Sequence, residues 1–102
     1  MEDIEARPMI RKLKISPKAL SDIQDAIGYY NQQQKGLGKR FADTAYDTVK
    51  QIGKMPQAAS ISHADIRYKV MQSFPFIITY RFDDGTLDIT RVFNTYADPD
   101  KL

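Results

Sequence analysis

The feature that most constrains the fold is the dipeptide Asp84-Gly85, which separates two runs rich in β-branched and aromatic residues. An Asp-Gly pair in this setting predicts a hairpin with a two-residue type I′ loop, because both loop positions need a positive φ. The loop in turn sets the pairing of the strands on either side. The predicted pairs are Asp83 with Thr86, Phe82 with Leu87, Arg81 with Asp88, Tyr80 with Ile89, Thr79 with Thr90, Ile78 with Arg91, and Ile77 with Val92.

This register gives the hairpin one apolar face. The residues on that face are Phe76, Ile78, Tyr80, Phe82, Leu87, Ile89 and Phe93. The other face carries an Arg–Asp pair and a Thr–Thr pair, both favourable across strands. A slip by one residue would turn the whole apolar set to the wrong side, so the register is strongly specified. Arg91 is the one charged residue on the apolar face, and we expect it near an edge or in a salt bridge.

The composition is that of one globular domain. The chain has 102 residues, 42% hydrophobic and 27% charged, and we expect a flexible lead-in at 1–9 followed by a single domain at 10–102. The absence of cysteine excludes disulfides and thiol chemistry. No stretch approaches the roughly 20 apolar residues of a membrane span, so we expect a cytoplasmic protein that does not bind membranes. A net charge of +2 is too small to indicate nucleic-acid binding by itself.

Two helices are predicted upstream of the hairpin. Residues 10–15 form a short strand whose basic residues indicate a sheet edge, and Ser16-Pro17 then starts a helix as N-cap and first helical residue. Gly36 and Gly38 mark the break before the second helix, so the two helices form an antiparallel pair. The apolar residues at helical spacing are Ala19, Leu20, Ile23, Ala26, Ile27 and Tyr30, and then Leu37, Phe41, Ala45, Val49 and Ile52.

A third strand is predicted between the helices and the hairpin. Residues 57–65 are small and polar, which indicates a loop. Residues 66–71 alternate, with Ile66, Tyr68 and Val70 on one side and two basic residues on the other. The predicted fold is therefore α+β. An N-terminal strand is followed by an antiparallel two-helix hairpin and a three-stranded antiparallel meander, with both helices on one face of the sheet.

Several strings, in order, are similar to those of one family. They are LKISPKALSDIQDAIGYY, GLGKRFADTAYDTVKQIGKMP, IRYKVMQSFPFIITYRF and VFNTYADPDK, which together cover about residues 13–100. The chain resembles the ParE/RelE superfamily of bacterial type II toxin–antitoxin toxins, also known as plasmid stabilization proteins. The resemblance implies a toxin held silent by a cognate antitoxin that wraps it. Relatives of the RelE type cut mRNA on the ribosome, whereas ParE-like relatives act on DNA gyrase.

The positions that a RelE-type nuclease uses are altered here. Such nucleases typically carry an arginine three residues before the tyrosine that corresponds to Tyr80, and this chain has Ile77 there. Asn94 stands where many relatives have histidine, and an amide cannot shuttle a proton. The ParE-like branch is therefore favoured, with no enzymatic turnover and no cofactor. The alternatives are a ribosome-dependent nuclease that uses Arg67, Arg81 and Tyr96, and an inactive toxin homologue retained as an antitoxin-binding protein.

Candidate contact residues follow from the predicted sheet and helices. We expect a target-binding surface on the open face of the sheet, formed by Arg67, Lys69, Arg81, Asn94 and Tyr96. The ordinary interpretation of the three basic residues is that they are solvated strand positions.

On the helices, Tyr29 and Tyr46 are candidates for antitoxin binding, with core or helix-pair packing as the ordinary interpretation of such aromatics. The single histidine, His63, lacks neighbours at ligand spacing apart from Asp65, so no metal site is predicted. A homodimer and a heterotetramer with the antitoxin both remain open.

Overall fold

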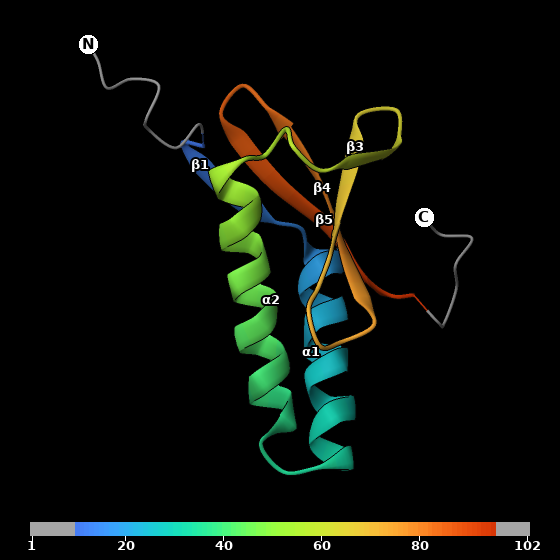
Figure 1. Ribbon diagram of the computed structural model, residues 1–102. Coiled ribbons are helices and arrows are strands. Elements are labelled where there is room, and N and C mark those ends of the chain that lie inside the picture. Colours follow the sequence, from blue (N-terminus) through green and yellow to red (C-terminus); the bar gives the residue numbers. More distant parts are fainter. Residues whose placement is uncertain (1–9, 96–102) are drawn as a thin grey trace.

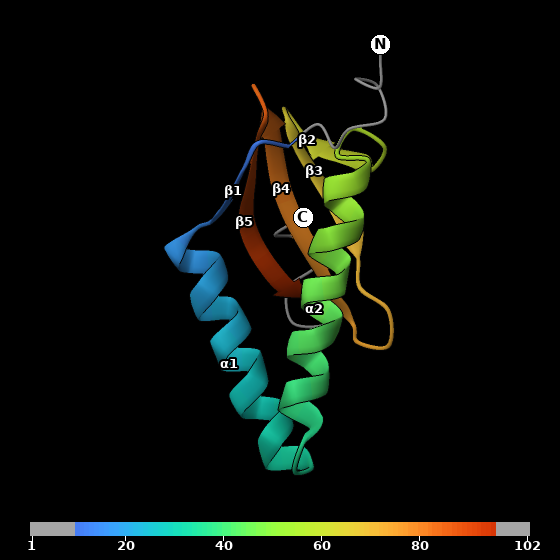
Figure 2. The same cartoon turned by 90° about the vertical axis from the view of Figure 1, so that its left-hand side faces the viewer.

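The structure, a computed structural model, describes residues 10–95. The elements in chain order are β1 (Lys12–Ile15), α1 (Pro17–Gln33), α2 (Leu37–Lys54), β2 (Ser60–His63), β3 (Ile66–Val70), β4 (Phe76–Asp83) and β5 (Thr86–Asn94). Within this range the strands form one five-stranded sheet in the order β1-β5-β4-β3-β2. The helices lie next to one another, and the turn that joins them lies beyond the end of the sheet (Figures 1 and 2). The predicted α+β class and the order of its elements are confirmed.

The central hairpin turns where the sequence predicts. Asp84 and Gly85 have φ values of 51° and 78°, the positive values that a type I′ loop requires. The four pairs next to the loop, from Asp83 with Thr86 to Tyr80 with Ile89, also agree with the prediction.

Beyond those four pairs the predicted register is wrong, because a β-bulge shifts it between Thr79 and Tyr80. Thr79 faces Arg91, Ile78 faces Val92, and Ile77 faces Phe93. Thr90 is therefore the extra residue of the bulge, although its hydroxyl still lies 2.7 Å from that of Thr79. The bulge turns Val92 toward the core in place of Arg91 and moves Phe93 off the apolar face.

The sheet has one strand more than predicted, and it is not wholly antiparallel. β1 lies at the edge, as expected, and it pairs with β5 in parallel. β2 was predicted as part of a loop at 57–65, but it pairs antiparallel with β3. Its Ser-Ile-Ser-His sequence is short and polar, so no apolar alternation marks it as a strand. Backbone hydrogen bonds to a neighbouring strand are sufficient to hold such a segment.

Both helices begin and end close to the predicted residues. Ser16 is the N-cap of α1, and its hydroxyl accepts a hydrogen bond of 3.0 Å from the Ala19 N–H. Gly36, with φ of 87°, precedes α2. Where the helices approach one another, a Cβ on Gly38 would lie 2.6 Å from the Ile27 carbonyl oxygen. The sequence therefore needs a glycine at this crossing.

The core lies between the helices and one face of the sheet. Its strand residues include Ile78, Tyr80, Leu87 and Ile89, which are all fully buried. The helices add an aromatic group in which the Phe41 ring lies 4.8 Å from that of Phe76 and 5.5 Å from that of Tyr30. One residue of the predicted α1 stripe, Leu20, is not in the core, because 47% of it is exposed.

Candidate functional site

The predicted open-face position of two basic residues on β3 is wrong. Arg67 lies opposite Tyr80 and Lys69 lies opposite Ile78, and directly opposite residues share a face of the sheet. Tyr80 and Ile78 belong to the core, so both basic residues lie on the side of the helices. The alternation along β3 was right, but its two sides were interchanged because the apolar side chains were assumed to face the core. Val70, on the other side, is 60% exposed.

Arg67 forms a hydrogen bond to the segment that connects α2 and β2. Its guanidinium Nη1 donates a hydrogen bond of 2.8 Å to the Ala59 carbonyl. The Tyr80 hydroxyl donates one of 2.7 Å to the Pro56 carbonyl in the same connection. Burial raises the pKa of this hydroxyl, and the positive charge of Arg67 acts in the opposite direction. The bond to Ala59 explains the position of Arg67 structurally, without a target molecule.

Arg81 lies on the open face, as predicted, beside a shallow hollow of about 370 Å³. The residues that line the hollow are Ser62, His63, Ile66, Thr79, Arg81, Thr90, Arg91 and Phe93. The Arg81 Nε lies 3.2 Å from Asp65 Oδ1, and the two side chains are 54% and 71% exposed. An ion pair this exposed is weak, so the Arg81 guanidinium is available to another molecule.

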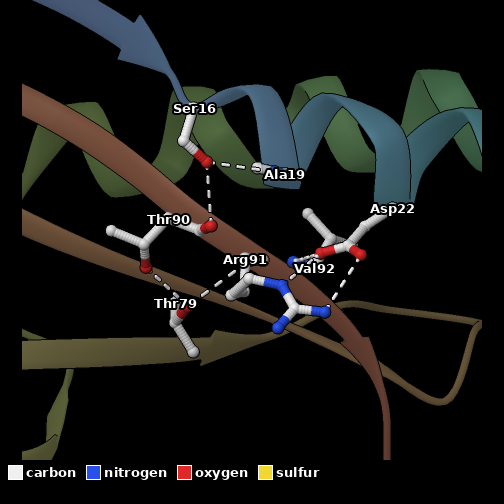
Figure 3. Close-up of polar contacts among 7 residues, drawn as sticks. All are labelled: Ser16, Ala19, Asp22, Thr79, Thr90, Arg91 and Val92. Carbon is white, nitrogen blue, oxygen red and sulfur yellow. Dashed lines mark hydrogen bonds and ion pairs between the residues drawn. The ribbon is translucent and has the colours of Figure 1, made fainter.

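Arg91 forms a half-buried ion pair that joins β5 to α1 (Figure 3). Its Nε and Nη2 donate to the two carboxylate oxygens of Asp22 at 2.7 and 3.1 Å. The same carboxylate accepts a bond of 2.9 Å from the Val92 N–H. The hydrogen bond to Asp22 raises the pKa of Arg91. The predicted salt bridge for Arg91 is thus confirmed, and its guanidinium also lies 4.4 Å from the centre of the Phe93 ring.

Asp22 was not among the predicted functional residues. Beyond the end of β1, two side chains bond to the backbone of β5 (Figure 3). The Ser16 hydroxyl donates a hydrogen bond of 2.9 Å to the Thr90 carbonyl, and the Asp22 carboxylate accepts one from the Val92 N–H. The sequence signal that points to it is the charged Arg91 within an apolar strand, because a partly buried cation needs a carboxylate partner.

Asn94 lies apart from the three basic residues. It pairs across the sheet with Phe76, and it lines a separate hollow of about 240 Å³ between α1 and the ends of β4 and β5. The other lining residues are Asp22, Asp25, Ala26, Tyr29, Phe76 and Val92. The predicted target-binding residues are therefore not brought together. Tyr96, the fifth of them, lies outside the described residues. Ile77 is buried, with 2% of its surface exposed.

Both tyrosines predicted to bind an antitoxin are accessible on the helices. Tyr29 is 55% exposed and Tyr46 is 64% exposed. Tyr29 meets the ring of Tyr30 edge-on at 5.1 Å, and the Lys50 ammonium lies 5.4 Å from the Tyr46 ring centre. Neither residue belongs to the core, so each offers an aromatic surface to a partner.

His63 lies at the end of β2, with its Nδ1 3.1 Å from the Ser62 hydroxyl. Across residues 10–95, no three of the His, Asp and Glu side chains come close enough to hold a metal ion. In the same range, neither helix has the length and apolar character needed to cross a bilayer.

Comparisons with known proteins give one family and one fold. The family model described as "ParE toxin of type II toxin-antitoxin system, parDE" matches residues 13–98. A solved structure described as "Chromosomal ParDE TA system from P. aeruginosa" is similar to this chain with a TM-score of 0.64 and 18% sequence identity. The match covers 84% of this chain and 97% of that chain. Among the curated proteins, no sequence matches significantly.

Proposed function

The chain belongs to the ParE toxins of type II toxin–antitoxin (parDE) systems, and on that premise we propose that it acts by binding DNA gyrase rather than by cutting RNA. The observation that carries this proposal is the arrangement of the cationic residues that a nuclease would use. Arg67 pairs with Tyr80, and Arg81 is the next residue of β4, so the two guanidiniums belong to opposite faces of the sheet.

A ribonuclease needs an acid, a base and a cation that converge on one phosphate. In this chain Ile77 is buried, and Asn94 lies beside α1 instead of on the open face. Arg67 is held by the Ala59 carbonyl. These positions support an action by binding, in which a surface rather than a set of proton-transfer groups meets the target.

The surface that fits a protein target is the open-face hollow. Arginine and aromatic side chains are enriched in the centres of protein interfaces, and this hollow offers Arg81 together with Phe93. Arg91 holds its charge at the rim, with its guanidinium against the Phe93 ring. The hollow thus replaces the target surface expected from the sequence, and Arg81 is the residue common to both.

The cognate antitoxin covers the helical hairpin in this proposal. An amphipathic helix of a partner binds a helical surface through apolar side chains at regular spacing. Tyr29 and Tyr46 supply exposed aromatic rings on α1 and α2 for such contacts. Because gyrase acts on the chromosome, the toxin and its antitoxin work in the cytoplasm.

The test is supercoiling by purified gyrase, with the chain added alone or together with its antitoxin. Inhibition at micromolar toxin that the antitoxin relieves would support the proposal. Activity of gyrase at all toxin concentrations would contradict it. Primer extension on ribosome-bound mRNA tests the nuclease, and induced expression without growth arrest would indicate an inactive homologue.

A further inference from the structure

The polar side chains that line the open-face hollow share one property, because each carries a hydrogen-bond donor and none is a carboxylate. They are Ser62, His63, Thr79, Arg81, Thr90 and Arg91. A hydroxyl or a neutral imidazole both donates and accepts, whereas a guanidinium only donates. The remaining lining residues, Ile66 and Phe93, are apolar. A ligand that fits this hollow therefore has a group that accepts several hydrogen bonds and an apolar part beside it.

Arg81 keeps two of its nitrogens unoccupied on the open face. Its Nε lies 3.2 Å from Asp65 Oδ1, while Nη1 and Nη2 make no hydrogen bond to any of residues 10–95. The side chain is 54% exposed. A guanidinium presents its N–H groups in a planar fork that matches the two oxygens of a carboxylate. Arg81 thus offers two donors to an acidic ligand without losing its own ion pair.

Arg91 is held in place before any ligand arrives. Its Nε and Nη2 donate to Asp22 at 2.7 and 3.1 Å, and its guanidinium lies 4.4 Å from the centre of the Phe93 ring. The third nitrogen, Nη1, points away from Asp22 (Figure 3) and has no hydrogen bond within the described residues. A side chain that is already ordered loses little conformational entropy on binding. Arg91 is therefore a preorganised donor in the hollow.

The carboxylates on this face of the sheet stand outside the hollow. Asp65 contacts Arg81, Asp88 lies opposite Arg81 on the same face, and neither lines the hollow. A nucleic-acid strand carries a phosphate with every nucleotide, so its phosphates beyond the hollow would meet these two negative charges. A single acidic side chain meets the donors of the hollow, and its methylene groups pack against Phe93 and Ile66. The arrangement of charges favours one carboxylate over a polyanion.

We propose that the open-face hollow binds one acidic side chain, a glutamate or an aspartate, on the surface of the protein that the toxin targets. Arg81 and Arg91 are the two anchors of its carboxylate, and Asp22 holds Arg91 against Phe93. The identity of the target protein rests on the proposed function. The preference for a carboxylate rests on the hollow alone.

The direct test is an NMR titration of the full chain labelled with nitrogen-15. The probes are the blocked tripeptide Ala-Glu-Ala, the blocked tripeptide Ala-Gln-Ala, and a trinucleotide of thymidine. The glutamate peptide is expected to shift the side-chain Nε–H signals of Arg81 and Arg91. The glutamine peptide, which lacks the charge, should bind about tenfold more weakly. Equal binding of the two peptides, or tighter binding of the trinucleotide than of the glutamate peptide, would overturn the proposal.

Arg81→Gln tests the first anchor. This substitution removes one exposed guanidinium and should weaken binding of the glutamate peptide about tenfold. Arg40→Gln is the matched control, because it removes an equally charged and exposed side chain from α2, away from the hollow. It should change binding less than about twofold. Equal effects of the two substitutions would show that the peptide responds to net charge and not to the hollow.

A pair of variants tests the second anchor without leaving an unpaired buried charge. Asp22→Asn keeps Arg91 and removes the carboxylate that competes for it, so the glutamate peptide should bind at least as tightly as to wild type. D22N/R91Q replaces both charges by amides and should bind about tenfold more weakly than Asp22→Asn. Equal binding by Asp22→Asn and D22N/R91Q would overturn the role of Arg91. Circular dichroism shows that the variants fold, and the Arg81→Gln comparison does not depend on this ion pair.

Inhibition of gyrase separates this proposal from the proposed function. Inhibition by a wild-type chain that does not bind the glutamate peptide would overturn the carboxylate site and leave the toxin function intact. Binding of the glutamate peptide by a chain that does not inhibit gyrase would support the carboxylate site and overturn the proposed target. The supporting result for both is a wild-type chain that binds the peptide and inhibits gyrase, with Arg81→Gln weakened in both measurements.

Discussion

At the scale of single residues, the Asp22 carboxylate is the group whose removal we expect to destabilise the fold most. It is 15% exposed, it neutralises Arg91, and it accepts the Val92 N–H. Substitution by alanine would leave a partly buried guanidinium and a backbone donor without partners. We expect Asp22→Ala to lower the free energy of unfolding by about 2 to 4 kcal/mol, measured by urea titration. Asp22→Asn keeps an acceptor for the Val92 N–H, so it should lose about half as much. Equal losses in the two variants would contradict this account.

The Tyr80 hydroxyl gives a prediction that depends on pH. Tyr80→Phe leaves the carbonyl of the buried Pro56 without its donor, which should cost about 1 to 2 kcal/mol at neutral pH. Burial raises the pKa of Tyr80 above the usual value of 10.0. Above that value the unfolded chain releases the phenolic proton while the folded chain keeps it, so the stability of the wild type falls as pH rises. The phenylalanine variant has no such proton to lose.

The difference in stability between wild type and Tyr80→Phe should therefore shrink above pH 10. Urea unfolding at neutral and at alkaline pH measures it. Tyr46→Phe is the matched control, because this ring is 64% exposed and the change should be within about 0.5 kcal/mol at either pH. A gap that widens with pH would show that the sign of the linkage is wrong.

At the scale of elements, local chemistry made some features predictable and others not. The N-cap at Ser16, the apolar spacing of both helices and the Asp84-Gly85 turn are determined by neighbouring residues, and each was predicted. The bulge at Thr90 was not, because no glycine or other local signal marks it. The faces of β3 were interchanged since one strand of five residues alternates equally well either way. Its orientation is decided by the pairing of Arg67 with Tyr80, a contact between separate elements.

The crossing of α1 and α2 gives a prediction at this scale. Gly38 lies against the backbone of α1, where an added Cβ would be 2.6 Å from the Ile27 carbonyl oxygen. Gly38→Ala should therefore push the helices apart and lower the free energy of unfolding by about 1 to 3 kcal/mol. Gly28→Ala is the matched control in α1, because nothing lies within 4 Å of its added Cβ. That substitution should stabilise the fold by about 0.5 to 1 kcal/mol. Similar effects of the two in thermal unfolding would contradict the close approach.

At the scale of the whole molecule, the sheet separates two groups of exposed side chains. The helices, with Tyr29 and Tyr46, and the apolar side chains of β1 lie on one side, and the hollow beside Arg81 lies on the other. The sequence predicted that a face of the sheet is open, but it assigned Arg67, Lys69 and Asn94 to it. Their actual positions depend on strand register and on the bulge, which are set by contacts far apart in the chain. In our proposals the antitoxin and the target therefore meet different surfaces.

This separation predicts a variant that loses one activity and keeps the other. Arg81→Ala removes an exposed guanidinium from the rim of the hollow, and its ion pair with Asp65 is too exposed to matter for folding. The change should raise the concentration of toxin that half-inhibits gyrase about tenfold, as the loss of an interface arginine typically does. It should leave binding of the antitoxin unchanged, because Tyr29 and Tyr46 lie on the helices and do not line the hollow. Asp65→Ala, which frees the same guanidinium, should inhibit gyrase at least as well as wild type. An Arg81→Ala chain that inhibits at the wild-type concentration would mean that gyrase binds elsewhere on the toxin.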